Sequence, residues 1–98
     1  MENRSLGIIE TFGLVPAIAC ADAALKTANV KLIGSQYAKN GLVAVFFLGD
    51  VSSVKAAVEA GGIAGAHVGK ISGSTLIARM ADGLILNFFS KRGVLFHG

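Results

Sequence analysis

The sequence predicts an α+β domain with the ferredoxin-like order βαββαβ, in which a four-stranded antiparallel sheet packs against two helices. Three observations support this prediction. The length of 98 residues suits one domain. Strand-like and helix-like patterns follow one another in that order along the chain. Finally, 53% of the residues are hydrophobic and only 15% are charged, so the chain has ample apolar surface to bury.

The first half of the chain predicts a strand, a helix and a second strand. Residues 5–12 are rich in β-branched and aromatic side chains, and Gly13 ends this strand. A helix is expected over about residues 15–28, because Pro16 suits the first turn of a helix and the segment is dense in alanine. Residues 30–36 predict the second strand.

A turn and the remaining three elements complete the predicted domain. Residues 37–41 contain Asn-Gly, which tolerates the positive φ angles of tight turns. Residues 42–48 are almost wholly apolar, as expected of a strand buried on both faces. Asp50 predicts the N-cap of a helix that runs to about residue 67, and residues 70–78 predict the fourth strand.

The tail departs from this plan. Two apolar segments, 84–89 and 94–96, flank the polar residues 90–93 and predict a β-hairpin. We therefore divide the chain into a domain of residues 1–79 and an apolar C-terminal extension of residues 80–98. Exposed apolar surface of this kind is typical of an interface, so we expect the extension to contact a neighbouring subunit or an internal partner.

The composition predicts an oligomer. A chain this short buries only roughly 60–65% of its surface when it folds alone, which leaves apolar side chains without cover. A membrane span needs ~20 consecutive apolar residues, and the sequence has no such run. Nor does its start resemble a signal peptide. We expect a soluble, cytoplasmic protein that buries its surplus apolar surface against copies of itself.

Catalytic and cofactor-binding motifs are weak or absent, so we expect no enzyme, no cofactor and no metal site. The segment that ends in Gly69-Lys70 lacks the first glycine of a phosphate loop, where Ala64 stands, and Ile71 follows the lysine. Cys20 lies among alanines, where a buried, inert thiol is expected. His67 and His97 have no partner pattern that suggests acid–base work.

Three segments of the sequence resemble the hexamer-forming shell proteins of bacterial microcompartments. Residues 6–18 resemble the opening strand and helix start of that family, 21–30 its first helix, and 49–61 its second. The likeness extends over about residues 6–79. It implies a structural protein whose hexamers tile into a shell with neighbouring hexamers and related shell proteins, around encapsulated enzymes, without nucleic acid or membrane.

The resemblance also implies two sets of site residues. Lys26 matches the lysine at the edge between adjoining hexamers, and Asn29 and Arg79 match its supporting residues. The loop between the second and third strands lines the pore in this family. The candidates here are Ala38, Lys39 and Asn40.

This loop departs from the glycine-serine-glycine type usual in the family. Lys39 repeated around a six-fold axis would add a ring of positive charge, and such a ring favours small polar or anionic metabolites over cations.

Two other functions remain open from the residues. A small-molecule-binding regulatory module of the same fold would use Gly61, Gly62 and Gly65 to make room for a ligand between subunits. An RNA-binding domain would need exposed aromatic side chains on its strands, and the net charge of +3 is modest for that role. The mass of the oligomer separates these readings, because a hexamer favours the shell protein.

Overall fold

The computed structural model describes residues 4–37, 39–80 and 95–96, and it confirms the βαββαβ order. A short 3₁₀ turn, η1 (Lys39–Gly41), joins β2 to β3. The six main elements are β1 (Arg4–Phe12), α1 (Leu14–Thr27), β2 (Lys31–Tyr37), β3 (Leu42–Gly49), α2 (Val51–Val68) and β4 (Lys70–Met80). Each agrees with its predicted range to within two residues.

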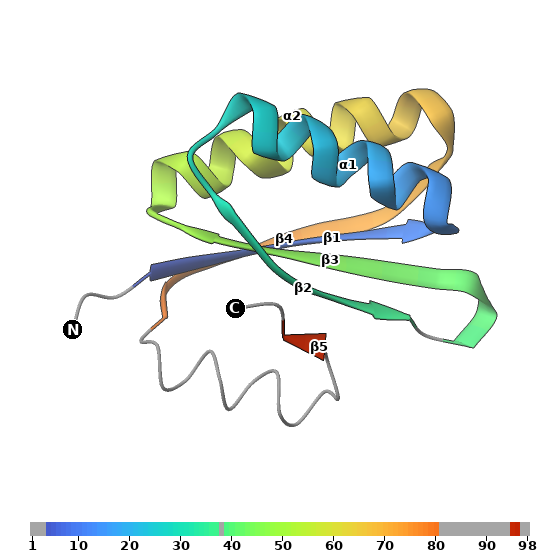
Figure 1. Ribbon diagram of the computed structural model, residues 1–98, viewed down its shortest axis with the longest axis horizontal. Helices are drawn as coiled ribbons and strands as arrows, with labels where there is room; N and C mark the ends of the chain where they lie inside the picture. Colours follow the sequence, from blue (N-terminus) through green and yellow to red (C-terminus); the bar gives the residue numbers. More distant parts are fainter. Residues whose placement is uncertain (1–3, 38, 81–94, 97–98) are drawn as a thin grey trace.

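The sheet has the order β4-β1-β3-β2-β5, and each neighbouring pair of strands is antiparallel. The first four strands are those predicted, and both helices cover the same face of the sheet (Figure 1). The short strand β5 (Leu95–Phe96) adds to the free edge of β2, where its residues pair with Ser35 and Gly34.

The expected C-terminal hairpin is only partly within the described residues. Residues 84–94 lie outside them. Leu95 and Phe96 form the short strand β5, which pairs with β2.

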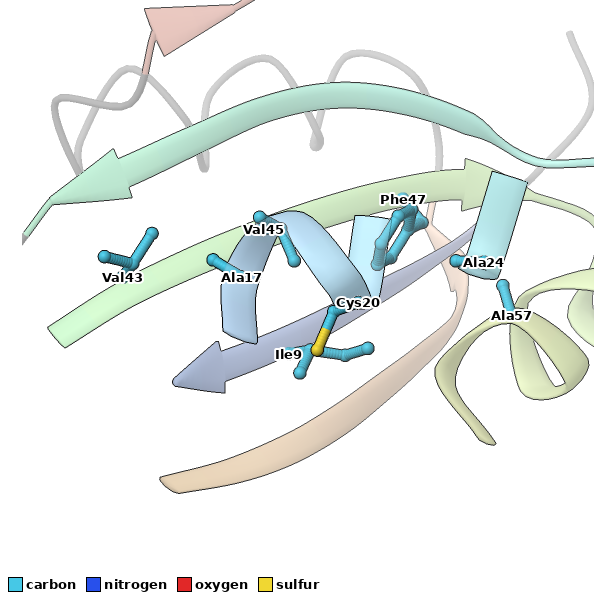
Figure 2. Close-up of a cluster of buried hydrophobic side chains, with 8 residues drawn as sticks. All are labelled: Ile9, Ala17, Cys20, Ala24, Val43, Val45, Phe47 and Ala57. Carbon is cyan, nitrogen blue, oxygen red and sulfur yellow. The ribbon is translucent and has the colours of Figure 1, made fainter. Parts of the chain in front are cut away.

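A hydrophobic core fills the space between the helices and the sheet (Figure 2). Alternate residues of the strands point into it, and small side chains of the helices allow the layers to approach closely. Its buried members are Ile9, Ala17, Cys20, Ala24, Val43, Val45, Phe47 and Ala57. Strand β3 lies inside the sheet and is buried from Val43 to Phe47, so the prediction that both of its faces are covered is confirmed.

The glycines of α2 divide into two kinds. A Cβ atom at Gly61 would lie 3.0 Å from the backbone oxygen of Cys20, and one at Gly65 would collide with the Cys20 Sγ atom. A Cβ atom at Gly62 would meet nothing within 4 Å. Close packing of α2 on α1 therefore requires glycine at positions 61 and 65, whereas no contact accounts for Gly62.

Local signals at the helix ends act largely as predicted. Asp50 caps α2, because its Oδ1 atom accepts a hydrogen bond of 2.8 Å from the backbone N–H of Ser53. Helix α1 ends at Thr27, one residue before the predicted end, and the backbone turns to an extended conformation at Ala28.

Candidate functional surfaces

The loop between β2 and β3 is fixed by left-handed backbone and by two hydrogen bonds. Asn40 has φ 69° and Gly41 has φ 79°, so the Asn-Gly turn forms as predicted. The Gly41 carbonyl accepts a hydrogen bond of 2.7 Å from the N–H of Gly13, at the start of α1. The Thr11 hydroxyl in turn donates to the Gly13 carbonyl, at 2.9 Å. The loop is therefore tied to the junction of β1 and α1.

The structure describes the three candidate pore residues to different extents. Ala38 lies outside the described residues. Lys39 is described in its backbone, which forms part of η1. Asn40 is exposed.

The candidate edge residues lie where α1 ends and where β4 ends. Lys26 is in the last turn of α1, its side chain 74% exposed, and its Nζ atom lies 3.0 Å from Asp22 Oδ2, which confirms the predicted i,i+4 pair. Asn29 is exposed in the connection to β2. Arg79 is the penultimate residue of β4, and only its backbone is described.

The strand register places these two sets at opposite ends of the molecule. At one end Ser5 faces Gly49 and Arg4 faces Met80, next to Arg79. At the other end Phe12 faces Leu42, which follows the loop. The eight residues of β3 span about 26 Å between the two ends. In Figure 1 the loop lies at the right, and α1 and β4 both end at the left.

Two exposed apolar surfaces flank the domain, and the sequence did not locate either of them. The first, which we call the α1 patch, comprises Leu14, Ile18 and Tyr37 around a shallow hollow of about 160 Å³. The second, the α2 groove, lies between α2 and β4. It has a volume of about 750 Å³ and includes the exposed side chains of Ile63 and Leu76.

The two surfaces lie on opposite flanks because of the strand order. Helix α2 packs mainly over β1 and β4 and also contacts β3, whereas α1 packs over β1, β3 and β2. Since β4 and β2 lie on either side of the β1–β3 pair, the α2 groove and the α1 patch face away from each other. A surplus of apolar residues in the composition was the only sequence signal for them.

The described residues offer little for catalysis. They contain no group of three or more His, Cys, Asp or Glu side chains that could hold a metal ion. Cys20 is buried, and desolvation by burial raises the pKa of its thiol, although a backbone hydrogen bond with Gly65 opposes this shift. A thiol of this kind is mostly protonated near neutral pH and is a poor nucleophile.

The structure also bears on the two other functions left open by the sequence. The spaces beside Gly61 and Gly65 are filled by α1 and by the sheet side chains Ile9 and Ile71, so they leave no room for a ligand. Gly62 has no such neighbour and borders the α2 groove. Phe46 and Phe47 are fully buried and cannot stack on nucleic-acid bases. Within the described ranges, no helix is both long enough and apolar enough to cross a membrane.

Solved structures place this fold among microcompartment proteins. A microcompartments protein from Desulfitobacterium hafniense DCB matches 82% of this chain with a TM-score of 0.75 and 29% sequence identity. The match covers 43% of that chain, so the present chain spans less than half of the longer protein.

Sequence comparison then shows the family. The BMC domain model matches residues 5–80. The bacterial microcompartment shell protein PduA of Citrobacter freundii is 46% identical over 79 residues, which cover 81% of this chain and 85% of that protein. The carboxysome shell protein CsoS1C of Halothiobacillus neapolitanus is 47% identical over 77 residues, or 78% of this chain and 79% of that protein. The chain belongs to the BMC domain family and is a shell protein of a bacterial microcompartment, a protein-shelled compartment of the cytoplasm.

Proposed function

We propose that this shell protein forms hexameric rings that tile edge to edge, with a central pore lined by the loop between β2 and β3. The observation that carries this proposal is the pair of unlike apolar surfaces on opposite flanks, the α1 patch and the α2 groove. The number six comes from the family resemblance, since the flanks alone support only a ring.

The ring follows from the symmetry of contacts. A two-fold dimer buries the same surface on both partners, and it would leave the other flank of each subunit exposed. A head-to-tail contact joins the α1 patch of one copy to the α2 groove of the next, and it covers both surfaces on every subunit once the ring closes. Burying apolar surface stabilises such a contact by roughly 25 cal/mol per Å².

The two ends of the molecule then take different places in the ring. If the flanks face neighbouring subunits, one end of the sheet points toward the axis and the other toward the rim. The loop with Lys39 and Asn40 occupies one end, and Asn29 and Arg79 occupy the other. We place the loop at the axis, because this leaves Lys26 at the rim for contact with the next hexamer.

The pore would pass small polar or anionic metabolites. Repeated around the axis, Lys39 contributes one positive charge per subunit to a narrow channel, and such a ring attracts anions and repels cations. Lys39→Ala should reduce the preference for anions in measurements of solute flux, and Lys39→Arg, which keeps the charge, should retain it. Equal anion and cation selectivity in all three proteins would contradict this role of Lys39.

The edge contact has a separate test. Lys26→Ala should leave hexamers intact in native mass spectrometry and abolish sheets of hexagons in electron micrographs. Lys70→Ala removes the same charge at the other end of the molecule, so it is the matched control and should still form sheets. A monomer or dimer of the unmodified chain at micromolar concentration would refute the ring, and would favour a regulatory module of the same fold.

A further inference from the structure

A second lysine lies at the end of the sheet that carries the loop. Strand β4 begins at Lys70, which faces Phe12 on β1. On its other side Phe12 faces Leu42, the residue that follows the loop. Lys70 therefore lies two strand spacings, or about 10 Å, from the start of β3. In Figure 1, β4 accordingly begins at the right, where the loop also lies.

The side chain of Lys70 lies over the helix-free face of the sheet, the face that points away from α1 and α2. Ile9 belongs to the core beneath the helices, and side chains alternate along β1, so Phe12 points to the opposite face. The Lys70 Nζ atom lies 5.2 Å from the centroid of the Phe12 ring, in a cation–π contact. The ring is 43% exposed and Lys70 is exposed, so this contact holds a solvent-accessible positive charge against the sheet.

We propose that Lys70 is a second determinant of the selectivity of the pore, and that it favours small anionic solutes such as carboxylates. This inference rests on the proposed hexamer with the loop at its axis. Every subunit of that hexamer turns its loop end inward, so six copies of Lys70 surround the mouth of the channel on the helix-free face. They add a wider ring of positive charge to the one that Lys39 supplies. Such a ring raises the local concentration of anions at the mouth.

An opposite charge lies on the same face, farther from the loop. Glu10 is the only acidic residue in the described strands, and its carboxylate accepts a hydrogen bond of 3.2 Å from the Ser72 hydroxyl. It precedes Phe12 by two residues along β1, so it lies about 7 Å farther from the loop end. Six copies of Glu10 form an outer ring that repels anions. Removing the charge of Lys70 and removing that of Glu10 should therefore change selectivity in opposite directions.

The test measures the flux of acetate and of acetamide through protein sheets that span a porous support. Acetamide is the uncharged analogue of acetate, so the ratio of the two fluxes reports on charge and not on pore width. Lys70→Gln should lower the acetate-to-acetamide ratio several-fold, and Glu10→Gln should raise it. Lys70→Arg keeps both the charge and the contact with an aromatic ring, so this matched control should retain the original ratio.

Ionic strength separates an effect of charge from an effect of structure. The Debye length is about 30 Å in about 10 mM salt and about 3 Å in about 1 M salt. The difference between Lys70→Gln and the unmodified protein should be large in the first solution and nearly vanish in the second. An equal fall in acetate and acetamide flux would show a change of pore shape and would overturn the proposal.

Two further results would overturn the role of Lys70. The first is an unchanged flux ratio in Lys70→Gln sheets, and the second is loss of the hexamer in native mass spectrometry, which would place Lys70 in a contact between subunits. If Lys39→Ala changes the ratio and Lys70→Gln does not, the proposed pore stands and only the inference about Lys70 fails. If acetamide does not cross sheets of the unmodified protein, the proposed pore fails and this inference fails with it.

Discussion

The contact between the two helices predicts opposite effects for the same substitution at two neighbouring glycines of α2. At Gly65 an added Cβ atom collides with Cys20 Sγ and would lie 2.8 Å from Ile71 Cδ1 and 3.2 Å from the backbone oxygen of Pro16. At Gly62 the same atom meets nothing within 4 Å. Both positions are inside one helix, so the change in helix propensity is common to both.

The magnitudes follow from two terms. Replacing glycine by alanine inside a helix stabilises it by about 1 kcal/mol. Forcing extra volume into a packed core costs typically about 1–3 kcal/mol. Gly62→Ala gains the first term alone and should raise the free energy of unfolding by up to ~1 kcal/mol. Gly65→Ala carries both terms, so its free energy of unfolding should lie about 1–3 kcal/mol below that of Gly62→Ala.

Urea denaturation followed by far-ultraviolet circular dichroism measures this difference. Because Gly62 borders the α2 groove, each protein is measured at two concentrations and its oligomeric mass is checked. Equal free energies of unfolding for the two variants would refute the packing argument.

A double-mutant cycle identifies the atom responsible. Cys20→Ala removes the sulfur that the new methyl group meets, so it should relieve part of the cost of Gly65→Ala. We expect a favourable coupling free energy of about 1 kcal/mol between these two substitutions. Gly62→Ala combined with Cys20→Ala should be additive within roughly 0.5 kcal/mol, because the two sites share no contact.

Three further predictions concern single side chains. Hydrogen bonds from the backbone N–H of Ser53 and from Ser52 lower the pKa of Asp50 in the folded chain. The stability that the Asp50 charge contributes is therefore present above the ordinary pKa of about 4. It is lost as the pH falls through the lower pKa of the folded chain. Asp50→Asn keeps an N-cap side chain but removes this titration, and acid denaturation curves of the two proteins should converge at low pH; a constant difference between them would contradict the assignment. Burial raises the pKa of the Cys20 thiol, so a thiol reagent at neutral pH should label the native chain far more slowly than the urea-unfolded chain, and equal rates would show that the site is accessible. Thr11→Val removes the hydroxyl that donates to the Gly13 carbonyl and should lower the free energy of unfolding by about 1 kcal/mol. Urea denaturation measures this loss, and Thr75→Val, at an exposed threonine on β4, is the control. Equal losses in the two variants would contradict a specific role for the Thr11–Gly13 hydrogen bond.

Local patterns were sufficient to predict the order and type of the elements. The alternation in β1, the alanine-rich stretch with Pro16, the Asn40-Gly41 turn and the cap at Asp50 each act over a few neighbouring residues, and the structure confirms them. The burial of β3 on both faces was visible in its composition for the same reason. The family was also recognisable from contiguous blocks of sequence.

Contacts between distant residues could not be predicted in this way. Nothing near Gly61 or Gly65 in the sequence indicates that Cys20 packs against them, more than 40 positions away, while Gly62 is free of such a contact. The positions of the α1 patch and the α2 groove depend on which strand each helix covers. The pairing of β5 with β2 likewise required the completed sheet.

By itself, the sequence determined the secondary structure, the family and the need to bury more apolar surface than one small core holds, because these depend on local propensity and on composition. Only the tertiary structure decided which surfaces remain exposed, and that the loop with Lys39 and the residues around Asn29 lie at opposite ends of the sheet. The physical reason is that strand order and register bring residues together across long separations, and no local pattern in the chain specifies those pairings.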